Sequence, residues 1–223
     1  GVVSGLAANP ERGTTSIIVS KQAVLALALH QLGKPTEARA ALVRAESLDA
    51  EKLPLVGANL GKNREVTDAA ADYATCIEAV CPYADYLVCN LSSPNTPGLR
   101  NLQARAQMQE IIERVLAARE RAGRGLPRLP PLLVKVGPDL DEAQILDIAE
   151  VALATKLDGL IVGNTTVDRP ATLRSAHKNE GGGLSGLPLV EKSQVCLAGM
   201  YKAVGGKVPI IGCGGVASGA HAY

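Results

Sequence analysis

The sequence of 223 residues contains neither phenylalanine nor tryptophan, so its five tyrosines supply all of the aromatic packing. A net charge of +1, from 23 basic and 22 acidic residues, provides no basic field for nucleic acid and no polybasic stripe for a membrane surface. No apolar run reaches about 18 residues, so we expect no membrane-spanning helix. The first residues show neither the charged start nor the apolar core of a signal peptide, and no targeting segment is expected.

Several catalytic classes are also excluded by what is missing. The three histidines lie far apart and no paired His/Cys spacing is present, so we expect no metal site. Ser93 has no evident histidine partner for an acyl-transfer triad, and no GxxxxGK[ST] loop for phosphate is found. The cysteines are odd in number, form no CxxC pair and are interpreted as buried reduced thiols. They are Cys76, Cys81, Cys89, Cys196 and Cys213.

From residue 53 onward, five continuous apolar runs alternate with amphipathic helices. Continuous Val/Ile/Leu runs indicate strands that are buried on both faces, which is typical of a parallel sheet. The runs are 53–59, 85–90, 131–136, 158–164 and 208–215. Apolar residues at helical spacing follow the first four runs, over 66–80, 108–116, 142–153 and 189–204. The predicted fold class is therefore α/β.

Two α/β architectures fit this alternation, a (β/α)₈ barrel and an open doubly wound sheet. In every unit, polar residues or glycines fall at the carboxyl end of the predicted strand. They are Asn59, Asn90, Lys135, Asn164 and the pair Gly214-Gly215. In a barrel these ends converge on one mouth, whereas an open sheet spreads them along a line. The recurrence favours a barrel, of which about five to six strands are present.

Residues 1–52 do not share this pattern. Ser20–Leu32 and Pro35–Leu48 are interpreted as a pair of helices that turns at Gly33. We expect two regions, a divergent N-terminal helical segment over 1–52 and an α/β barrel region over 53–223.

The residues at the strand ends favour a flat, uncharged or anionic ligand. Asparagine offers hydrogen-bond donors and an acceptor together, so converging asparagines suit a planar heterocycle with carbonyl and N–H edges. Lys135 lies within a strand, where an ammonium group is costly unless it meets an anion. The glycine loops 181–186 and 212–215 allow backbone N–H groups to approach a phosphate.

Six segments, in this order, resemble the quinone-linked (class 2) dihydroorotate dehydrogenases. They are "ANLGKN", "YLVCNLSSPNTPGLRNLQ", "LLVKVGPDL", "DGLIVGNTTVDRP", "GGLSGLPL" and "VPIIGCGGVASG". The resemblance covers roughly residues 53–223, about three quarters of the chain. It implies a TIM barrel that binds FMN and oxidises dihydroorotate to orotate, with ubiquinone as electron acceptor, in pyrimidine (UMP) biosynthesis. It also implies peripheral membrane association, at the mitochondrial inner membrane in eukaryotes.

The resemblance also assigns roles to individual residues. Ser93 corresponds to the catalytic base that removes the C5 proton of dihydroorotate. Residues that match the family's pyrimidine contacts are Asn90, Asn95, Asn164 and Thr165. Residues that match its flavin contacts are Asn59, Asn90, Lys135, Gly163, Gly186 and Gly215. No metal is implied.

The sequence departs from the family at both ends. The first two barrel strands, with a lysine and an "RYGFN"-type segment, have no counterpart before Asn59, and the eighth strand would lie beyond Tyr223. Gly163 stands where the family often has threonine or serine. Two alternatives to an active enzyme therefore remain. One is a truncated, catalytically inactive barrel fragment that acts as a binding or interaction module, and the other is a phosphate-binding barrel of different chemistry.

Overall fold

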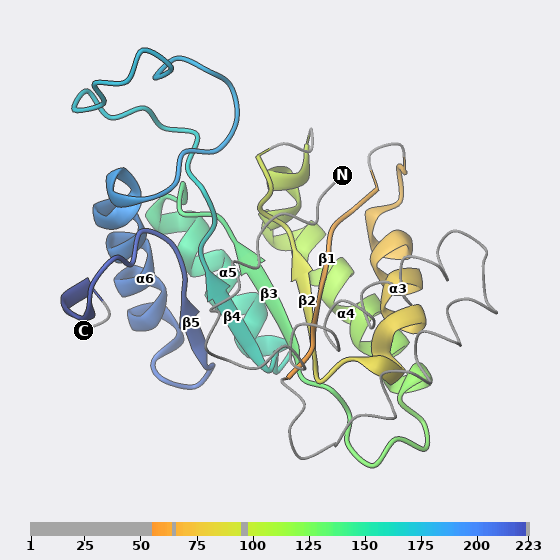
Figure 1. Cartoon of the computed structure of the whole chain (residues 1–223). Coiled ribbons are helices and arrows are strands. Elements are labelled where there is room, and N and C mark those ends of the chain that lie inside the picture. Colours follow the sequence, from red (N-terminus) through yellow and green to blue (C-terminus); the bar gives the residue numbers. More distant parts are fainter. Residues whose placement is uncertain (1–54, 64–65, 95–97, 222–223) are drawn as a thin grey trace, which may run out of the picture. The chain divides into compact units, whose positions relative to one another are not determined.

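A computed structural model describes residues 55–63, 66–94 and 98–221 of the chain. Strands and helices alternate along Gly57–Tyr223, which form one compact unit (Figure 1). The helical pair that the sequence predicts within 1–52 lies outside the described residues.

Five parallel strands form one sheet in the order β1-β2-β3-β4-β5. The strands are β1 (Gly57–Leu60), β2 (Tyr86–Asn90), β3 (Leu132–Val136), β4 (Gly159–Val162) and β5 (Ile210–Gly212). The helices between them are α3 (Ala69–Val80), α4 (Arg105–Ala122), α5 (Glu142–Ala154) and α6 (Val190–Val204). Short 3-10 helices span Cys81–Tyr83, Leu99–Gln103, Leu187–Leu189 and Gly219–His221. Each predicted strand and each predicted helix from residue 53 onward is thus present, with shifted ends.

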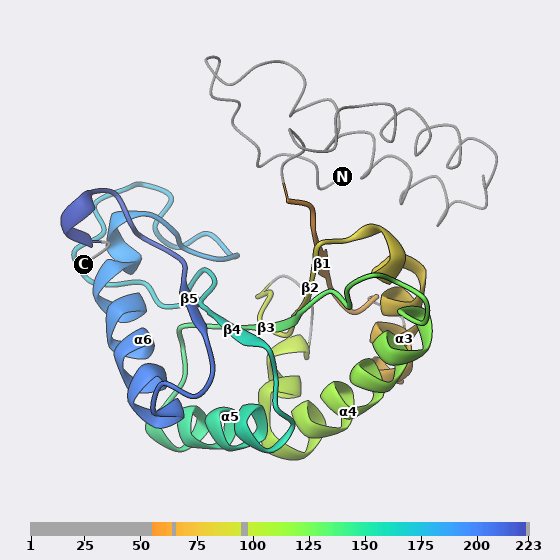
Figure 2. The same cartoon turned by 90° about the horizontal axis from the view of Figure 1, so that it is seen from below.

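The four helices α3 to α6 all cover the same face of the sheet, which curves away from them (Figure 2). A doubly wound sheet carries helices on both faces, so this arrangement excludes that alternative for the described part of the chain. An arc of parallel strands inside an arc of helices is the geometry of a partial (β/α)₈ barrel. The predicted fold class is therefore confirmed, and the curved sheet leaves one concave face.

The helix starts are set by capping side chains. The sequence pattern begins at Val66, but α3 starts at Ala69, because the Asp68 side chain accepts a hydrogen bond from Ala71 N at 2.9 Å. At the start of α5, Asp141 and Gln144 form a reciprocal capping box. The acidic start that the sequence predicts for this helix is therefore a true cap.

The core lies between the sheet and the helices. In β3 the first, third and fifth residues are fully buried, whereas Lys135, the fourth, is half-buried. Because side chains alternate across a strand, the buried set faces the helices and Lys135 faces the concave side. Among the described tyrosines, only Tyr73 of α3 is fully buried. Aliphatic side chains and Met108 and Met200 fill most of the remaining core.

Candidate active site

Polar side chains from three adjacent strands form rows on the concave face. The strand register places Asn90 of β2 level with Lys135 of β3, and Lys135 level with Ile161 of β4. Asn59 of β1 is level with Val88, two residues before Asn90, and therefore lies on the same face one row lower. Asn59, Asn90 and Lys135, which the sequence singles out, thus share one surface.

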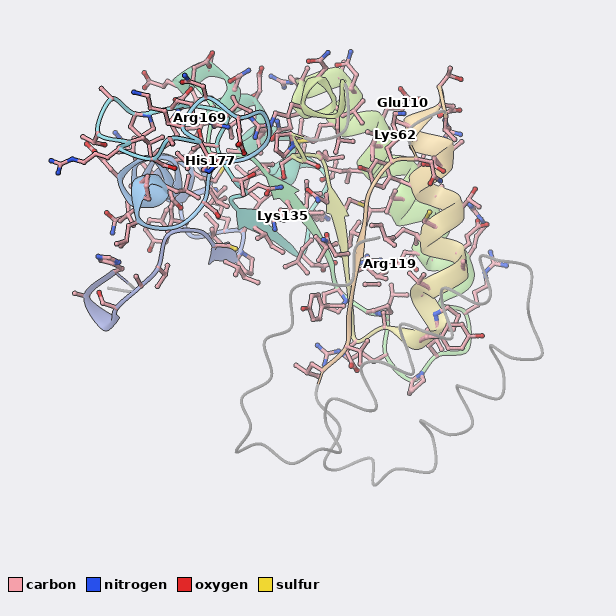
Figure 3. All side chains as sticks on the ribbon, turned by 45° about the horizontal axis from the view of Figure 1, so that its top comes forward. Lys62, Glu110, Arg119, Lys135, Arg169 and His177 are labelled. Atoms are coloured by element: carbon pink, nitrogen blue, oxygen red, sulfur yellow. The ribbon has the colours of Figure 1, made fainter. Side chains whose placement is uncertain are left out.

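Lys135 is the isolated cation of this surface. It is half-buried, and its ammonium group has no hydrogen bond or ion pair with any residue that the structure describes. Figure 3 shows Lys135 on the sheet, whereas Arg169 and His177 belong to the loop after β4. A partly desolvated ammonium without a carboxylate is suited to an anionic or electron-rich ligand.

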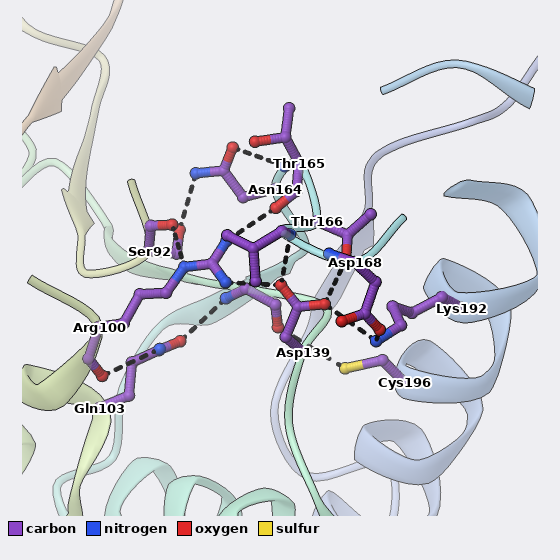
Figure 4. A network of polar contacts seen from close by, with 12 residues as sticks. Ser92, Arg100, Gln103, Asp139, Asn164, Thr165, Thr166, Asp168, Lys192 and Cys196 are labelled. Carbon is purple, nitrogen blue, oxygen red and sulfur yellow. Dashed lines mark hydrogen bonds and ion pairs between the residues drawn. The ribbon is translucent and has the colours of Figure 1, made fainter. Parts of the chain in front are cut away.

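A chain of hydrogen bonds joins the carboxyl ends of β2 and β4 through Ser92 (Figure 4). The fully buried Ser92 donates its hydroxyl proton to Asn90 Oδ1 at 2.8 Å, and Asn164 Nδ2 donates to Ser92 Oγ at 3.0 Å. Asn164 Oδ1 accepts in turn from Thr165 N at 2.8 Å. These contacts fix the orientation of both amides, so that Asn90 keeps its Nδ2 protons for a ligand.

The backbone of Asn90 is fixed from the helix side. The buried Tyr73 hydroxyl donates to Asn90 O at 2.7 Å. Burial raises the pKa of this hydroxyl, which therefore stays a neutral donor at all physiological pH values. The last residue of β2 is thus held at both its backbone and its side chain.

Next to this chain lies a cluster of charges around Asp139, in the loop after β3 (Figure 4). One carboxylate oxygen accepts from Arg100 Nη1 at 2.5 Å and from Val167 N at 3.1 Å. The other accepts from Lys192 Nζ at 3.0 Å and from the hydroxyl of Thr166. Burial acts to raise the pKa of Asp139, but the hydrogen bonds from Thr166, Lys192 and Arg100 outweigh it and lower the pKa.

Lys192 of α6 also pairs with Asp168, in the loop after β4. Desolvation acts to lower the pKa of Lys192, yet its bonds to Asp168 and Asp139 raise the pKa above the usual value. The carboxyl ends of β3 and β4 and the first turns of α6 are therefore connected by charge-assisted hydrogen bonds.

Comparison with known proteins identifies this arrangement. A family model for dihydroorotate dehydrogenase matches residues 22–223. The chain belongs to the dihydroorotate dehydrogenase family. Relatives include the quinone-type dihydroorotate dehydrogenase of Xanthobacter autotrophicus, 56% identical over 169 residues, which are 76% of this chain and 47% of that protein. The mitochondrial quinone-type enzyme of Arabidopsis thaliana is 52% identical over 170 residues, 76% of this chain and 37% of that protein. The chain thus spans half or less of the length of these two relatives.

Solved structures agree with the sequence comparison. The crystal structure of dihydroorotate dehydrogenase from Eimeria tenella in complex with ferulenol matches with a TM-score of 0.72 and 42% sequence identity. The match covers 78% of this chain and 50% of that one. The five strands and their helices therefore correspond to part of the barrel of a dihydroorotate dehydrogenase.

The described residues fit the FMN that this family uses. Lys135 supplies an unpaired positive charge on the concave face, Asn90 supplies an amide beside it, and Asn59 supplies a second amide two strands away on the same face. The loop after β5 lies very close to the first residue of α6. A Cβ atom added at Gly215, whose φ is +75°, would lie 2.8 Å from Val190 Cγ2 and 2.9 Å from Val190 N. Close backbone approach at a helix N-terminus suits a phosphate group.

The remaining predicted flavin contacts lie in loops. Gly186, with φ of +82°, precedes the 3-10 helix that leads into α6, and its carbonyl accepts from Leu189 N at 3.0 Å. Gly163 is buried directly after β4, and its N–H donates to Cys213 O at 3.0 Å. A flavin contact at Gly163 therefore has to use its carbonyl oxygen, since the residue has neither a free N–H nor a side chain.

The predicted substrate residues are partly brought together. Asn90 and Asn164 are connected through Ser92, and Thr165 follows Asn164 directly. Ser93 is half-buried in the loop after β2, three residues beyond the end of that strand. Asn95, the other predicted pyrimidine contact, lies outside the described residues.

Sequence reasoning did not assign a role to Ser92, Arg100, Asp139 or Lys192. The first three fall inside the quoted segments "NLSSPN", "PGLRNLQ" and "KVGPDL". For Asp139, a charged residue shortly after a strand is a usable signal. Lys192 carries no such signal, because it lies on a helix face that the sequence alone does not orient.

The other expectations concern metals, thiols and membranes. Among residues 55–63, 66–94 and 98–221, no group of His, Cys, Asp or Glu side chains is placed to hold a metal ion. All five cysteines are free thiols. Cys81, Cys89 and Cys196 are buried, and Cys213 is exposed. None of the helices in the described part of the chain is long and apolar enough to cross a membrane.

Proposed function

We propose that this chain catalyses the FMN-dependent oxidation of dihydroorotate to orotate with a quinone as electron acceptor, in pyrimidine biosynthesis. The observation that carries the proposal is the hydrogen-bond chain Asn90–Ser92–Asn164. Its Asn90 lies level with Lys135, and its Ser92 directly precedes Ser93. Membership of the dihydroorotate dehydrogenase family supports it.

Each residue has a defined task in this proposal. Ser93 Oγ takes the proton at C5 of dihydroorotate while its own hydroxyl proton leaves through a relay to solvent. The hydroxyl acts as a base only if bulk water is kept from the ring and the geometry is held. Asn90, Asn164 and Thr165, together with Asn95, hydrogen-bond the flat pyrimidine ring. FMN bound here would supply the acceptor for the hydride that leaves C6. Asn59 and Lys135 hold its ring system, while the glycines near α6 hold its phosphate.

The relatives support a proposal for the electron acceptor and for the location. The matched proteins are quinone-type enzymes, from bacteria and, for the Arabidopsis thaliana protein, named mitochondrial. We propose ubiquinone as the acceptor and peripheral association with the membrane that contains it, which is the mitochondrial inner membrane in a eukaryotic cell.

The first test is the colour of the purified chain after addition of FMN. Retained visible absorbance that is bleached by dihydroorotate without oxygen is the expected result. A folded protein that does not retain FMN would contradict the proposal and favour the second candidate, an inactive barrel fragment with a binding role. Retained FMN without bleaching would indicate different chemistry.

The second test is Ser93→Ala. Loss of a general base is expected to slow flavin reduction by about 10²–10⁴-fold while FMN stays bound, because Ser93 acts on the substrate. Stopped-flow bleaching with dihydroorotate measures the rate. Ser175→Ala, in the exposed loop after β4, is the matched control and is expected to reduce flavin at the wild-type rate. Equal rates for both variants would remove Ser93 from the mechanism.

A further inference from the structure

The guanidinium group of Arg100 lies between three loops of the candidate active site (Figure 4). Arg100 belongs to the 3-10 helix Leu99–Gln103. Its Nε donates to Ser92 O at 3.3 Å, in the loop after β2, and its Nη2 donates to Thr165 O at 2.9 Å, in the loop after β4. Its Nη1 donates to Asp139 Oδ2 at 2.5 Å, in the loop after β3. One side chain thus connects the carboxyl ends of three neighbouring strands.

These contacts are shielded and directional. The side chains of Arg100 and Asp139 are only 22% and 15% exposed, so the ion pair is weakly screened by solvent and salt. The guanidinium group is planar and its N–H groups point in fixed directions. Its plane therefore fixes the separation of Ser92 from Thr165, while Asp139 fixes the guanidinium.

The two carbonyl groups that Arg100 holds belong to residues next to the proposed reacting groups. Ser92 precedes Ser93, the proposed base, and Thr165 follows Asn164, a proposed pyrimidine contact. A proton can be removed from C5 only if the base and the ring are held within hydrogen-bond reach of each other.

We propose that Arg100 is a positioning residue that sets the distance between Ser93 and the Asn164–Thr165 pair, with Asp139 as its orienting counter-ion. This inference rests on the proposed function for its catalytic consequence, but the loop coupling itself is a property of the chain without flavin or substrate. A lysine at position 100 keeps the charge but loses the planar fork, so Arg100→Lys separates geometry from charge.

The first experiment measures amide hydrogen exchange by mass spectrometry on the flavin-free chain. The amides of Leu91 and Ser92, and those of Thr165 and Thr166, are all hydrogen-bonded in the structure. Arg100→Lys is expected to speed exchange in both segments together by at least about tenfold, with α4 and α5 unchanged.

The matched control is Arg105→Lys, at the start of α4, where the exposed arginine pairs with Glu150 and Asp147. It is expected to leave both segments unchanged. Asp139→Asn is expected to loosen the same two segments as Arg100→Lys, and it keeps the proposal testable if an Arg100 variant fails to fold. Exchange that is unaltered in either segment, or raised throughout the compact unit, would overturn the inference.

The second experiment uses FMN-loaded protein and dihydroorotate deuterated at C5 or at C6. If Arg100 positions the base, Arg100→Lys slows flavin reduction at saturating substrate and enlarges the C5 isotope effect, but does not enlarge the C6 effect. A general loss of stability would not enlarge the isotope effect at C5 alone. If dihydroorotate does not bleach the flavin of the wild-type protein, the proposed function is contradicted but the loop coupling is not. The exchange experiment still tests the coupling, because it needs neither flavin nor substrate. Both isotope effects at wild-type values would overturn the positioning role.

Discussion

At the scale of single residues, the site contains side chains whose polar groups are hydrogen-bonded within the protein, together with one charged side chain that has no such partner among the described residues. Ser92 and Asp139 form their hydrogen bonds with other residues of the protein. Lys135 faces the concave side without a partner among the described residues. An unpaired, half-buried ammonium contributes little to the stability of the flavin-free protein. The ammonium group can instead form its favourable electrostatic interaction with a bound ligand.

The Lys135→Met variant tests this division. The flavin-free variant is expected to be at least as stable as the wild type in urea unfolding, because no ion pair is lost. Its affinity for FMN is expected to fall by at least about tenfold, as measured by equilibrium dialysis. Lys207→Met, which removes an exposed lysine beyond α6, is the control and should change neither quantity. Unaltered FMN affinity in Lys135→Met would show that this lysine is an ordinary surface residue.

At the scale of secondary-structure elements, the two ends of the strands serve different tasks. The carboxyl ends hold the polar residues of the site. At the amino ends, Arg119 of α4 donates to the carboxylate of Asp158, just before β4, and to Pro130 O at 3.4 Å. Asp158 also accepts from Leu132 N, at the start of β3, at 2.8 Å. One carboxylate therefore joins a helix to two strands, on the barrel face that provides stability rather than chemistry.

Asp158→Ala is expected to lower the free energy of unfolding by about 2–3 kcal/mol, because Leu132 N loses its acceptor and the Arg119 charge stays buried. The Arg119 side chain is 11% exposed, and its Nε already has no hydrogen-bond partner among the described residues. Urea unfolding monitored by circular dichroism measures the difference.

Glu78→Ala provides the comparison for Asp158→Ala. This carboxylate also pairs with an arginine of α4, Arg121, but both side chains are about half exposed. Its removal should cost less than about 1 kcal/mol. Equal losses in the two variants would contradict the assigned role of Asp158.

At the scale of the whole molecule, the alternation of apolar runs and helical patterns was sufficient to predict the parallel sheet and the partial barrel. That signal is local, since each strand or helix shows its own periodicity. The same pattern located Asn90, Lys135 and Asn164 at or just beyond strand ends, and the resemblance assigned a role to Ser93. The charge cluster around Asp139 could not be predicted, because its contacts to Arg100 and Lys192 span 39 and 53 residues of sequence. Only the folded sheet brings these loops together.

The same cluster makes the stability of the molecule depend on pH. The pKa of Asp139 is lowered in the folded state, so its contribution is fully present above the ordinary carboxyl pKa of about 4 and is lost as the pH falls through the folded value. At pH 7, Asp139→Asn is expected to be less stable than the wild type by on the order of 2 kcal/mol. The difference should shrink steadily below about pH 4. Urea unfolding over this pH range measures it, and a constant difference would show that the Asp139 charge does not stabilise the fold.

The order of the strands has a consequence for how the protein is made. Each strand from β2 to β5 pairs with the strand that precedes it in the chain, through one intervening helix. A nascent polypeptide can therefore add one strand and one helix at a time as it leaves the ribosome, with each new unit finding its docking surface already complete. Because each of the described strands β2 to β5 pairs with a strand that has already been translated, vectorial synthesis and the growth of this sheet proceed in the same direction.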